Sequence, residues 1–296
     1  MASEKASWEL EAGTAIAEGR TVLKGLGGGK RYEVFLVWDE LMHAIAVAKV
    51  LRPDQAEDEK ALRDLREEAE LLERISHPVI VRGFDAVLDG GFPHLLIEHL
   101  EGPSLRRLIR RGGPLAPEQL LPLALHVAGA LHYLEQIGFV HLDVKPDNII
   151  MGIPPRLIDL SIARSLERAA RAKGPIGTDA YMAPEQCVPD APEPMGPPSD
   201  VWGLGATLHH SISGKRPFPR EKGARESPDP GVRFPQLHSP PEPLPGSVSP
   251  DVAELISEML APDPGARPTA AEVSERLEPA VARQPSRVRL GRRRAI

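Results

Sequence analysis

The stretch His141-Leu142-Asp143-Val144-Lys145-Pro146-Asp147-Asn148, followed eleven residues later by Asp159, decides how the rest of the sequence is interpreted. It supplies a carboxylate, an ammonium group and an amide within six residues, and its proline prevents a helix from forming over them. A carboxylate can orient a hydroxyl, an ammonium group can neutralise phosphate, and amide and carboxylate oxygens can ligate Mg²⁺. The stretch therefore predicts a site that handles a nucleotide.

Length and composition limit the class of protein. The 296 residues suggest one large domain or two small ones, and 41% hydrophobic with 26% charged residues is typical of a soluble globular chain. No apolar run is long enough to span a membrane, and residues 1–11 lack the apolar core of a signal peptide. The single cysteine and the net charge of −6 favour a cytoplasmic protein with no internal disulfide and no nucleic-acid partner.

Hydrophobic periodicity divides the chain into a strand-rich half and a helical half. Strands are expected at residues 32–37, 44–50, 79–81 and 94–99, and helices at residues 62–75, 117–136, 199–212, 251–260 and 269–277. This order predicts an α+β fold with a small antiparallel-sheet lobe carrying one long helix, and a larger, mainly helical lobe. The expected units are an N-terminal extension (1–17), an N-lobe with its hinge (18–100), a C-lobe (101–280) and a basic tail (281–296).

Three further features precede the deciding stretch at characteristic spacing. A glycine-rich run covers residues 25–34, and Lys49 ends an apolar strand fifteen residues after Val34. Glu68 follows Lys49 by nineteen residues and flanks the buried stripe of the long helix. With the stretch at 141–148, these features make the sequence resemble the protein kinase family, and in particular the bacterial Ser/Thr kinases.

The resemblance implies a two-lobed kinase fold that transfers the γ-phosphoryl group of ATP to Ser or Thr of a protein, with Mg²⁺ or with Mn²⁺ in its place. It implies catalytic roles for Asp143, Lys145, Lys49 and Glu68, and metal ligation by Asn148 and Asp159. The expected nucleotide-binding residues are Leu26, Gly27, Gly29, Val34, Val47, Lys49, Ile97, Glu98, Leu100, Asn148 and Asp159. In the hinge, the Glu98 carbonyl and the Leu100 amide are expected to contact adenine.

Motifs later in the chain favour a resemblance to protein kinases over a resemblance to small-molecule phosphotransferases. The segment from Gly177 to Glu185 contains Ala-Pro-Glu, Asp200 opens an Asp-Val-Trp helix, and Arg267 precedes a proline. In the family the glutamate pairs with the late arginine, and the helix-starting aspartate anchors the catalytic loop. Buried carboxylates need such partners.

Four positions depart from the family pattern. Leu142 replaces the arginine that normally receives an activation-loop phosphate, so we expect activity without such phosphorylation. Ser161 replaces a glycine, Val47 crowds the adenine position, and Tyr32 falls where a third loop glycine is usual and should stiffen the loop. These changes keep a second interpretation open, a pseudokinase-like scaffold that binds nucleotide with little turnover.

Three segments lie outside this scheme. Ten prolines between residues 215 and 250 argue against regular helix there, and Pro240–Pro243 is a candidate for docking a partner domain. Cys187 suits a packed small residue better than a redox sensor. The six arginines of residues 283–294 are expected to form a disordered chain end, with acidic lipid or nucleic acid as the alternative contact.

Overall fold

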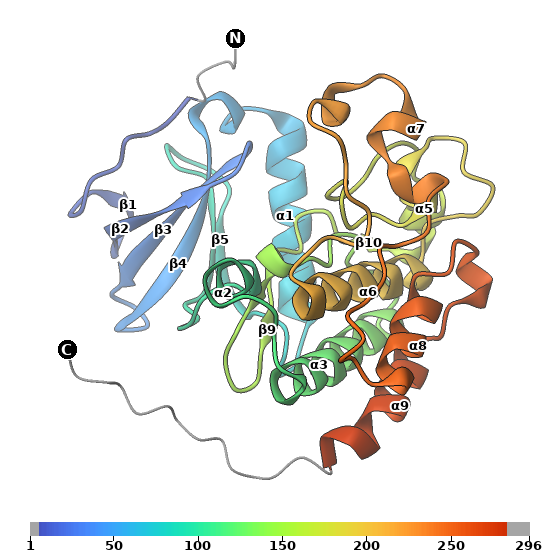
Figure 1. The fold of residues 1–296 in the computed structure, drawn as a ribbon. Coiled ribbons are helices and arrows are strands. Elements are labelled where there is room, and N and C mark those ends of the chain that lie inside the picture. Colours follow the sequence, from blue (N-terminus) through green and yellow to red (C-terminus); the bar gives the residue numbers. More distant parts are fainter. Residues whose placement is uncertain (1–5, 283–296) are drawn as a thin grey trace.

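The computed structural model describes residues 6–282 and has the two-lobed α+β architecture expected from the sequence. Figure 1 shows the sheet of the N-lobe on one side, the helices of the C-lobe on the other, and α1 between them. The two lobes meet along a cleft that holds the residues singled out above.

The N-lobe is built on a six-stranded antiparallel sheet with the order β1-β2-β3-β4-β6-β5. Its strands are β1 (Ala15–Ala17), β2 (Arg20–Gly28), β3 (Tyr32–Asp39), β4 (Ala44–Leu51), β5 (Gly83–Val87) and β6 (His94–Glu98). The register sets Val34 opposite Lys49 and Val47 opposite Ile97. Alternation along β3 buries Phe35 and Val37 on one face.

Helix α1 (Glu59–Arg74) is the one long helix of the N-lobe. It begins at Asp58, whose side chain accepts a hydrogen bond from the Ala61 amide at 2.7 Å and so caps the first turn. Leu65 and Leu72 bury one face of the helix against the sheet, and Glu68 is buried on the same face. The packing that holds α1 therefore also carries Glu68 into the interior.

The C-lobe is arranged around α3 (Pro117–Gln136), which packs against α6 and α9. Its other helices are α2 (Leu105–Gly112), α4 (Leu166–Ala170), α5 (Pro184–Cys187), α6 (Pro197–Ser213), α7 (Pro230–Arg233), α8 (Pro250–Met259) and α9 (Ala270–Ala282). Two short strand pairs, β7 (Phe139–Val140) with β10 (Arg164–Ser165) and β8 (Ile149–Ile150) with β9 (Arg156–Leu157), flank the stretch at residues 141–148. Among the described residues, none of the helices has the length and apolar character that crossing a membrane requires.

Two sequence predictions need correction. Residues 79–81 do not form a regular strand: Ile80 makes an isolated bridge to Leu157, and the apolar run is buried where the lobes join. Burial alone produced the strand-like pattern. The proline-rich segment 215–250 does contain one α-helical turn, α7, besides two 3-10 turns. Pro230 occupies the first position of α7, where its missing N–H costs no hydrogen bond, and Asp229 caps the turn.

Residues 6–14 and the edge strand β1 lie against the N-lobe sheet. The Trp8 indole N–H donates to the Leu51 carbonyl at 2.7 Å, and its ring packs edge-on against Phe92. Ser7 donates to the Glu33 carboxylate at 2.7 Å. The basic tail predicted for residues 281–296 lies outside the described residues from position 283 onward.

Candidate active site

Lys49 joins the two lobes through its ammonium group. Its Nζ lies 2.8 Å from a Glu68 carboxylate oxygen on α1 and 2.7 Å from Asp159 Oδ1 in the C-lobe. The three residues come from β4, α1 and the loop after β9, so three separate elements converge on one nitrogen. The structure thus brings together the lysine, the glutamate and the second aspartate that the sequence placed far apart.

Burial and charge act in opposite directions on this triad. Burial lowers the pKa of Lys49, but the carboxylates of Asp159 and Glu68 outweigh it and raise that pKa overall. Burial alone would raise the pKa of Asp159, but the Lys49 ammonium holds it far below its usual range. For Glu68 burial prevails, and its pKa is raised despite the lysine. The ammonium and the Asp159 carboxylate are therefore charged at neutral pH.

The catalytic stretch forms a compact polar cluster in front of this triad. Lys145 Nζ lies 2.5 Å from Asp143 Oδ2 and donates to Thr178 Oγ1 at 2.7 Å. The Asn148 amide nitrogen donates to the Asp143 carbonyl at 3.0 Å and to Asp143 Oδ2 at 3.1 Å. Within residues 6–282 the other carboxylate oxygen of Asp143 is buried without a hydrogen-bond partner. That oxygen is available to a hydroxyl that enters the cluster.

A buried carboxylate holds the backbone of the stretch. Asp200, at the start of α6, accepts hydrogen bonds from the His141 and Leu142 amides, each at 2.7 Å. Leu142 has φ +62°, which is unfavourable for a side chain with a Cβ, and its carbonyl accepts from the Gln186 amide at 2.9 Å. The anchoring role expected for Asp200 is confirmed, and together with Gln186 it stabilises the strained backbone next to Asp143.

Glu185 and Arg267 form the pair that the sequence predicted. Two guanidinium nitrogens of Arg267 lie 2.7 and 2.9 Å from the two carboxylate oxygens, and both side chains are buried. Ser199 donates to the same carboxylate at 2.8 Å. The Arg267 guanidinium also stacks over the Trp202 ring. This network ties the Ala-Pro-Glu segment to α6 and to the turn before α9.

A cavity of 650 Å³ between the lobes contains most of the predicted nucleotide-binding residues. The predicted residues that line it are Leu26, Val34, Val47, Lys49, Glu68, Ile97, Glu98, Leu100, Asn148 and Asp159. Within the described chain the Leu100 amide donates to no protein acceptor, and the Glu98 carboxylate is turned away to Arg156. The Leu100 amide is therefore free to donate a hydrogen bond to a ligand in the cavity.

The sequence missed several apolar residues of this cavity. Leu72, Val81, Ile150 and Ile158 line its inner wall. Ile150 and Ile158 could have been found, because they stand next to Asn148 and Asp159 in short apolar runs that bracket the polar residues. No signal marks Leu72 or Val81, because their approach to the cavity depends on how α1 and the lobe junction pack.

The glycine-rich hairpin between β2 and β3 is shaped by two glycines. Gly27 has φ +111°, and a Cβ on Gly28 would collide with the Tyr32 carbonyl oxygen. Gly29, which the sequence selected, has open space around the Cβ position. The position where sterics require a glycine is therefore Gly28, one residue earlier. Tyr32 turns inward: it is buried, and its ring centroid lies 4.4 Å from Lys49 Nζ.

The segment between Asp159 and Glu185 is held from the proline-rich side of the C-lobe. The Asp179 carboxylate pairs with Arg220 at 2.8 Å and with Arg233 at 3.1 Å. Gln236 donates to the Asp179 carbonyl at 2.7 Å. We call Asp179, Arg220, Arg233 and Gln236 the segment clamp. No sequence motif pointed to it, because its partners lie 41 to 57 positions away from Asp179.

Leu142 lies in an apolar environment where the usual arginine would offer a charge. It is buried with Val140, Ala169 and Met195. Ser161, at the other departure, lies near Asp159 and helps to lower the pKa of its carboxyl group. Cys187 is buried, its thiol hydrogen-bonds to the Ala183 carbonyl, and burial raises its pKa well above the usual range, so it behaves as a packed residue.

Comparison with known proteins gives one consistent family. A family model described as the protein kinase domain matches residues 20–277. The serine/threonine-protein kinase PknB of Mycolicibacterium smegmatis is 31% identical over 264 residues, covering 84% of this chain and 40% of PknB. A protein of Corynebacterium efficiens named a probable serine/threonine-protein kinase is 31% identical over 283 residues, which is 89% of this chain and 41% of the relative. PkwA of Thermomonospora curvata is 32% identical over 255 residues, which is 85% of this chain and 33% of PkwA. The chain therefore spans about two fifths or less of these relatives.

Proposed function

The chain belongs to the protein kinase family, and from that premise we propose that it transfers the γ-phosphoryl group of ATP to Ser or Thr side chains of a protein. The convergence of Glu68 and Asp159 on the Lys49 ammonium supports the proposal most strongly. A lysine paired in this way presents a fixed charge to the phosphates at the inner end of the cavity.

Each polar side chain has a place in this reaction. Lys49 holds the α- and β-phosphates, and Glu68 positions Lys49. Asp143, whose free carboxylate oxygen is buried, accepts the substrate hydroxyl and orients it toward the phosphoryl group. Lys145, between Asp143 and Thr178, stabilises the charge that develops on the transferred group.

The residues present also fit a magnesium ion delivered with ATP. Mg²⁺ is commonly bound by one or two protein oxygens with the phosphates and water completing its coordination. Asp159 supplies a carboxylate at the cavity wall, and Asn148 keeps its amide oxygen free because its nitrogen donates to Asp143. The described residues contain no cluster of three or more His, Cys, Asp or Glu able to hold a metal alone. When bound, the ion would offset phosphate charge, and Asn148 and Asp159 would hold it.

Two observations support Ser and Thr as acceptors. Lys145 follows Asp143 by two residues, and its ammonium group donates to the hydroxyl of Thr178 at 2.7 Å. This contact ties the loop that carries Asp143 to the Gly-Thr segment, the combination by which the sequence resembles Ser/Thr-directed kinases. The names of the relatives agree with this acceptor class.

We also propose that activity does not require phosphorylation of the activation segment. A phosphate would find an apolar pocket at Leu142 instead of a guanidinium. The segment clamp supplies the fixed position that a phosphate gives elsewhere, through the two arginine contacts of Asp179. Protein treated with a phosphatase should therefore keep its turnover, and loss of turnover after treatment would contradict this part of the proposal.

Labelled ATP, Mg²⁺ and a generic protein substrate test the main proposal. We expect label on Ser or Thr of the substrate, and its loss with Asp143→Asn, because an amide cannot accept the hydroxyl proton. Asp147→Asn is the matched control, since that acid lies in the same loop outside the polar cluster. Nucleotide binding with no label transferred would instead indicate the scaffold interpretation. Docking of a partner through Pro240–Pro243 is a separate proposal that this assay does not address.

A further inference from the structure

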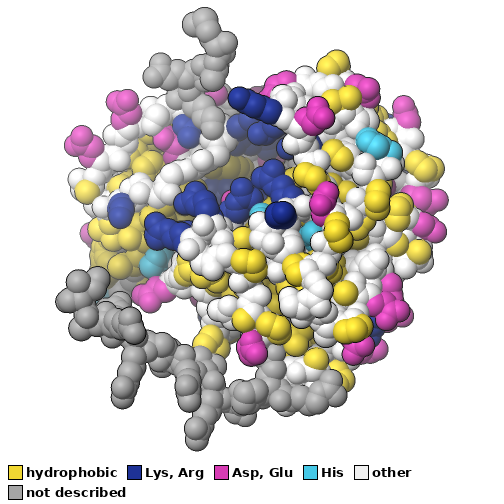
Figure 2. Space-filling model, in the orientation of Figure 1, with side chains coloured by type: hydrophobic (Ala, Val, Ile, Leu, Met, Phe, Trp, Pro, Cys, Tyr) yellow, Lys and Arg dark blue, Asp and Glu magenta, His cyan; other side chains and the backbone are white. Residues whose placement is uncertain are grey.

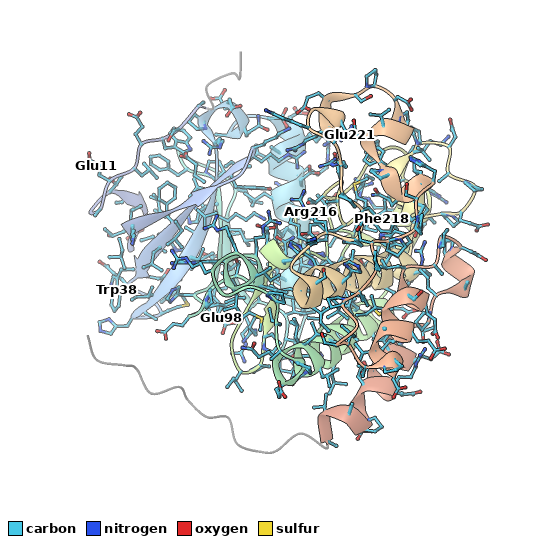
Figure 3. All side chains as sticks on the ribbon, in the orientation of Figure 1. Glu11, Trp38, Glu98, Arg216, Phe218 and Glu221 are labelled. Carbon is cyan, nitrogen blue, oxygen red and sulfur yellow. The ribbon has the colours of Figure 1, made fainter. Side chains whose placement is uncertain are left out.

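The basic side chains of this acidic protein gather beside the active site. Figure 2 shows Lys and Arg side chains across the middle of one face, between the N-lobe and the C-lobe. A cavity of 580 Å³ after α6 is lined by Lys215, Arg216, Arg220 and Arg225, with Glu221 and Glu242 as its acidic members. Arg216 is labelled near the middle of the view in Figure 3. We call these four basic residues together with Arg106 of α2 the basic groove.

Most residues of the basic groove form no ion pair, although Glu221, Glu242 and Asp147 lie in the same region. Arg220 is paired with Asp179, but within residues 6–282 Arg106, Lys215, Arg216 and Arg225 form no ion pair with an acidic side chain. Of the fifteen ion pairs of the described chain, fourteen involve no residue of the basic groove. Because the whole chain has a net charge of −6, this local excess of cations does not follow from the overall composition.

Contacts connect the basic groove to the catalytic loop. The half-buried Arg106 donates to the Tyr181 hydroxyl at 3.4 Å, and the same hydroxyl lies 2.7 Å from His210 Nδ1. Arg216 also lies near this hydroxyl, and its charge acts to lower the Tyr181 pKa. Tyr181 closes a turn on Thr178, whose side chain contacts Lys145. Helix α2 itself packs against the turn at residues 146–148.

The pKa of His210 depends on its burial and on the nearby cations. Burial first, and then the charges of Arg106 and Arg216, lower its pKa to about 4. The guanidinium groups of Arg106 and Arg216 therefore lie close enough to act on the imidazole that contacts the Tyr181 hydroxyl.

We propose that the basic groove selects protein substrates with Asp or Glu close to the acceptor Ser or Thr, by pairing their carboxylates with Arg106 and Arg216. The inference rests on the proposed function, since it names the substrate class of the same site. Guanidinium groups form directed, charge-assisted hydrogen bonds to carboxylates, and a partly buried position weakens screening by water and salt.

Three peptides with one central Ser and with Glu, Ala or Lys on both sides of it test the proposal. We expect kcat/KM for the Glu peptide to exceed that for the Lys peptide by about tenfold or more at low salt, since two partly buried pairs each contribute a fewfold. The ratio should shrink in 0.5 M salt. Arg106→Glu and Arg216→Glu should each lower the ratio and move the preference toward Lys, and Arg63→Glu, an exposed basic residue on α1, should leave the ratio unchanged.

The ratio of kcat/KM values distinguishes a change in specificity from a folding defect, because a misfolded variant loses activity toward all three peptides alike. If a charge-reversal variant fails to fold, which thermal unfolding would reveal, Arg106→Gln and Arg216→Gln provide milder substitutions. Equal kcat/KM for the three peptides with the native chain would overturn this inference and leave the proposed function intact. If no peptide is phosphorylated, the proposed function fails, and anisotropy of labelled peptides decides the inference: it requires tighter binding of the Glu peptide.

Discussion

At the scale of single residues, a substitution of Glu68 tests whether its ion pair fixes the position of the Lys49 ammonium group. Glu68→Gln keeps the shape of the side chain but removes the charge that fixes the ammonium group. A charge-assisted hydrogen bond is worth about 2 kcal/mol, so we expect kcat/KM for ATP to fall about tenfold or more. Glu73→Gln on the exposed face of the same helix is the control and should change kcat/KM less than twofold. Equal activities of the two variants would show that Asp159 alone positions Lys49.

Tyr32 gives a residue-scale prediction about stability. Its hydroxyl is buried without a hydrogen-bond partner among the described residues, and burial raises its pKa to about 12. Tyr32→Phe removes an unsatisfied polar group and keeps the ring beside Lys49, so urea unfolding should show a free energy of unfolding equal to, or about 1 kcal/mol above, the native value. Tyr133→Phe is the matched control: that hydroxyl accepts from the Ser76 amide at 2.9 Å, and its loss should destabilise. A clear decrease for Tyr32→Phe would contradict the structural assignment.

At the scale of elements, the segment clamp should govern protein substrates and leave ATP unaffected. Asp179→Asn removes the charge that holds Arg220 and Arg233, so the activation segment loses its tie to α7. We expect kcat/KM for a protein substrate to fall about tenfold, by analogy with a lost buried ion pair, while KM for ATP stays the same. Asp190→Asn, an exposed aspartate later in the same region, serves as the control. A parallel rise in KM for ATP would show that the clamp acts on the whole fold.

Elements with strong local signals could be predicted from the sequence, and those shaped by tertiary contacts could not. The bounds of α3 match the prediction at both ends, because Pro117 and Gly138 mark them. Residues 79–81 were misassigned since a buried apolar run has the same composition in a strand and in an irregular junction. Helix α2 was missed: five of its eight residues are arginine or glycine, and only Leu105 and Ile109 are buried.

At the scale of the whole molecule, the sequence identified the chemical groups of the site but not its electrostatic surroundings. Spacing sufficed for Lys49, Glu68 and Asp159, because the family resemblance orders them along the chain. The basic groove could not be anticipated, since Arg106 and Arg216 are 110 positions apart and become neighbours only when α2 and the loop after α6 fold around Tyr181. Net charge, the one electrostatic quantity that a sequence gives directly, has the opposite sign to the groove.

Burial of His210, together with the nearby charges of Arg106 and Arg216, makes the stability of the folded chain depend on pH. His210 titrates near 6.5 when unfolded but has a pKa of about 4 when folded, so the unfolded chain binds more protons between these values. Its contribution to stability is therefore intact above pH 7 and is lost as the pH falls, by about 2 kcal/mol between pH 7 and pH 5.

Urea unfolding of the native chain and of His210→Gln at both pH values checks this expectation. The glutamine can still accept from the Tyr181 hydroxyl, but it cannot take up a proton. The variant should therefore lose less stability on acidification than the native chain does. His43→Gln, on the β3–β4 turn, controls for removing a histidine as such. If the native chain and His210→Gln lose the same free energy between pH 7 and pH 5, the pKa of His210 is not lowered in the folded chain, and this expectation is wrong.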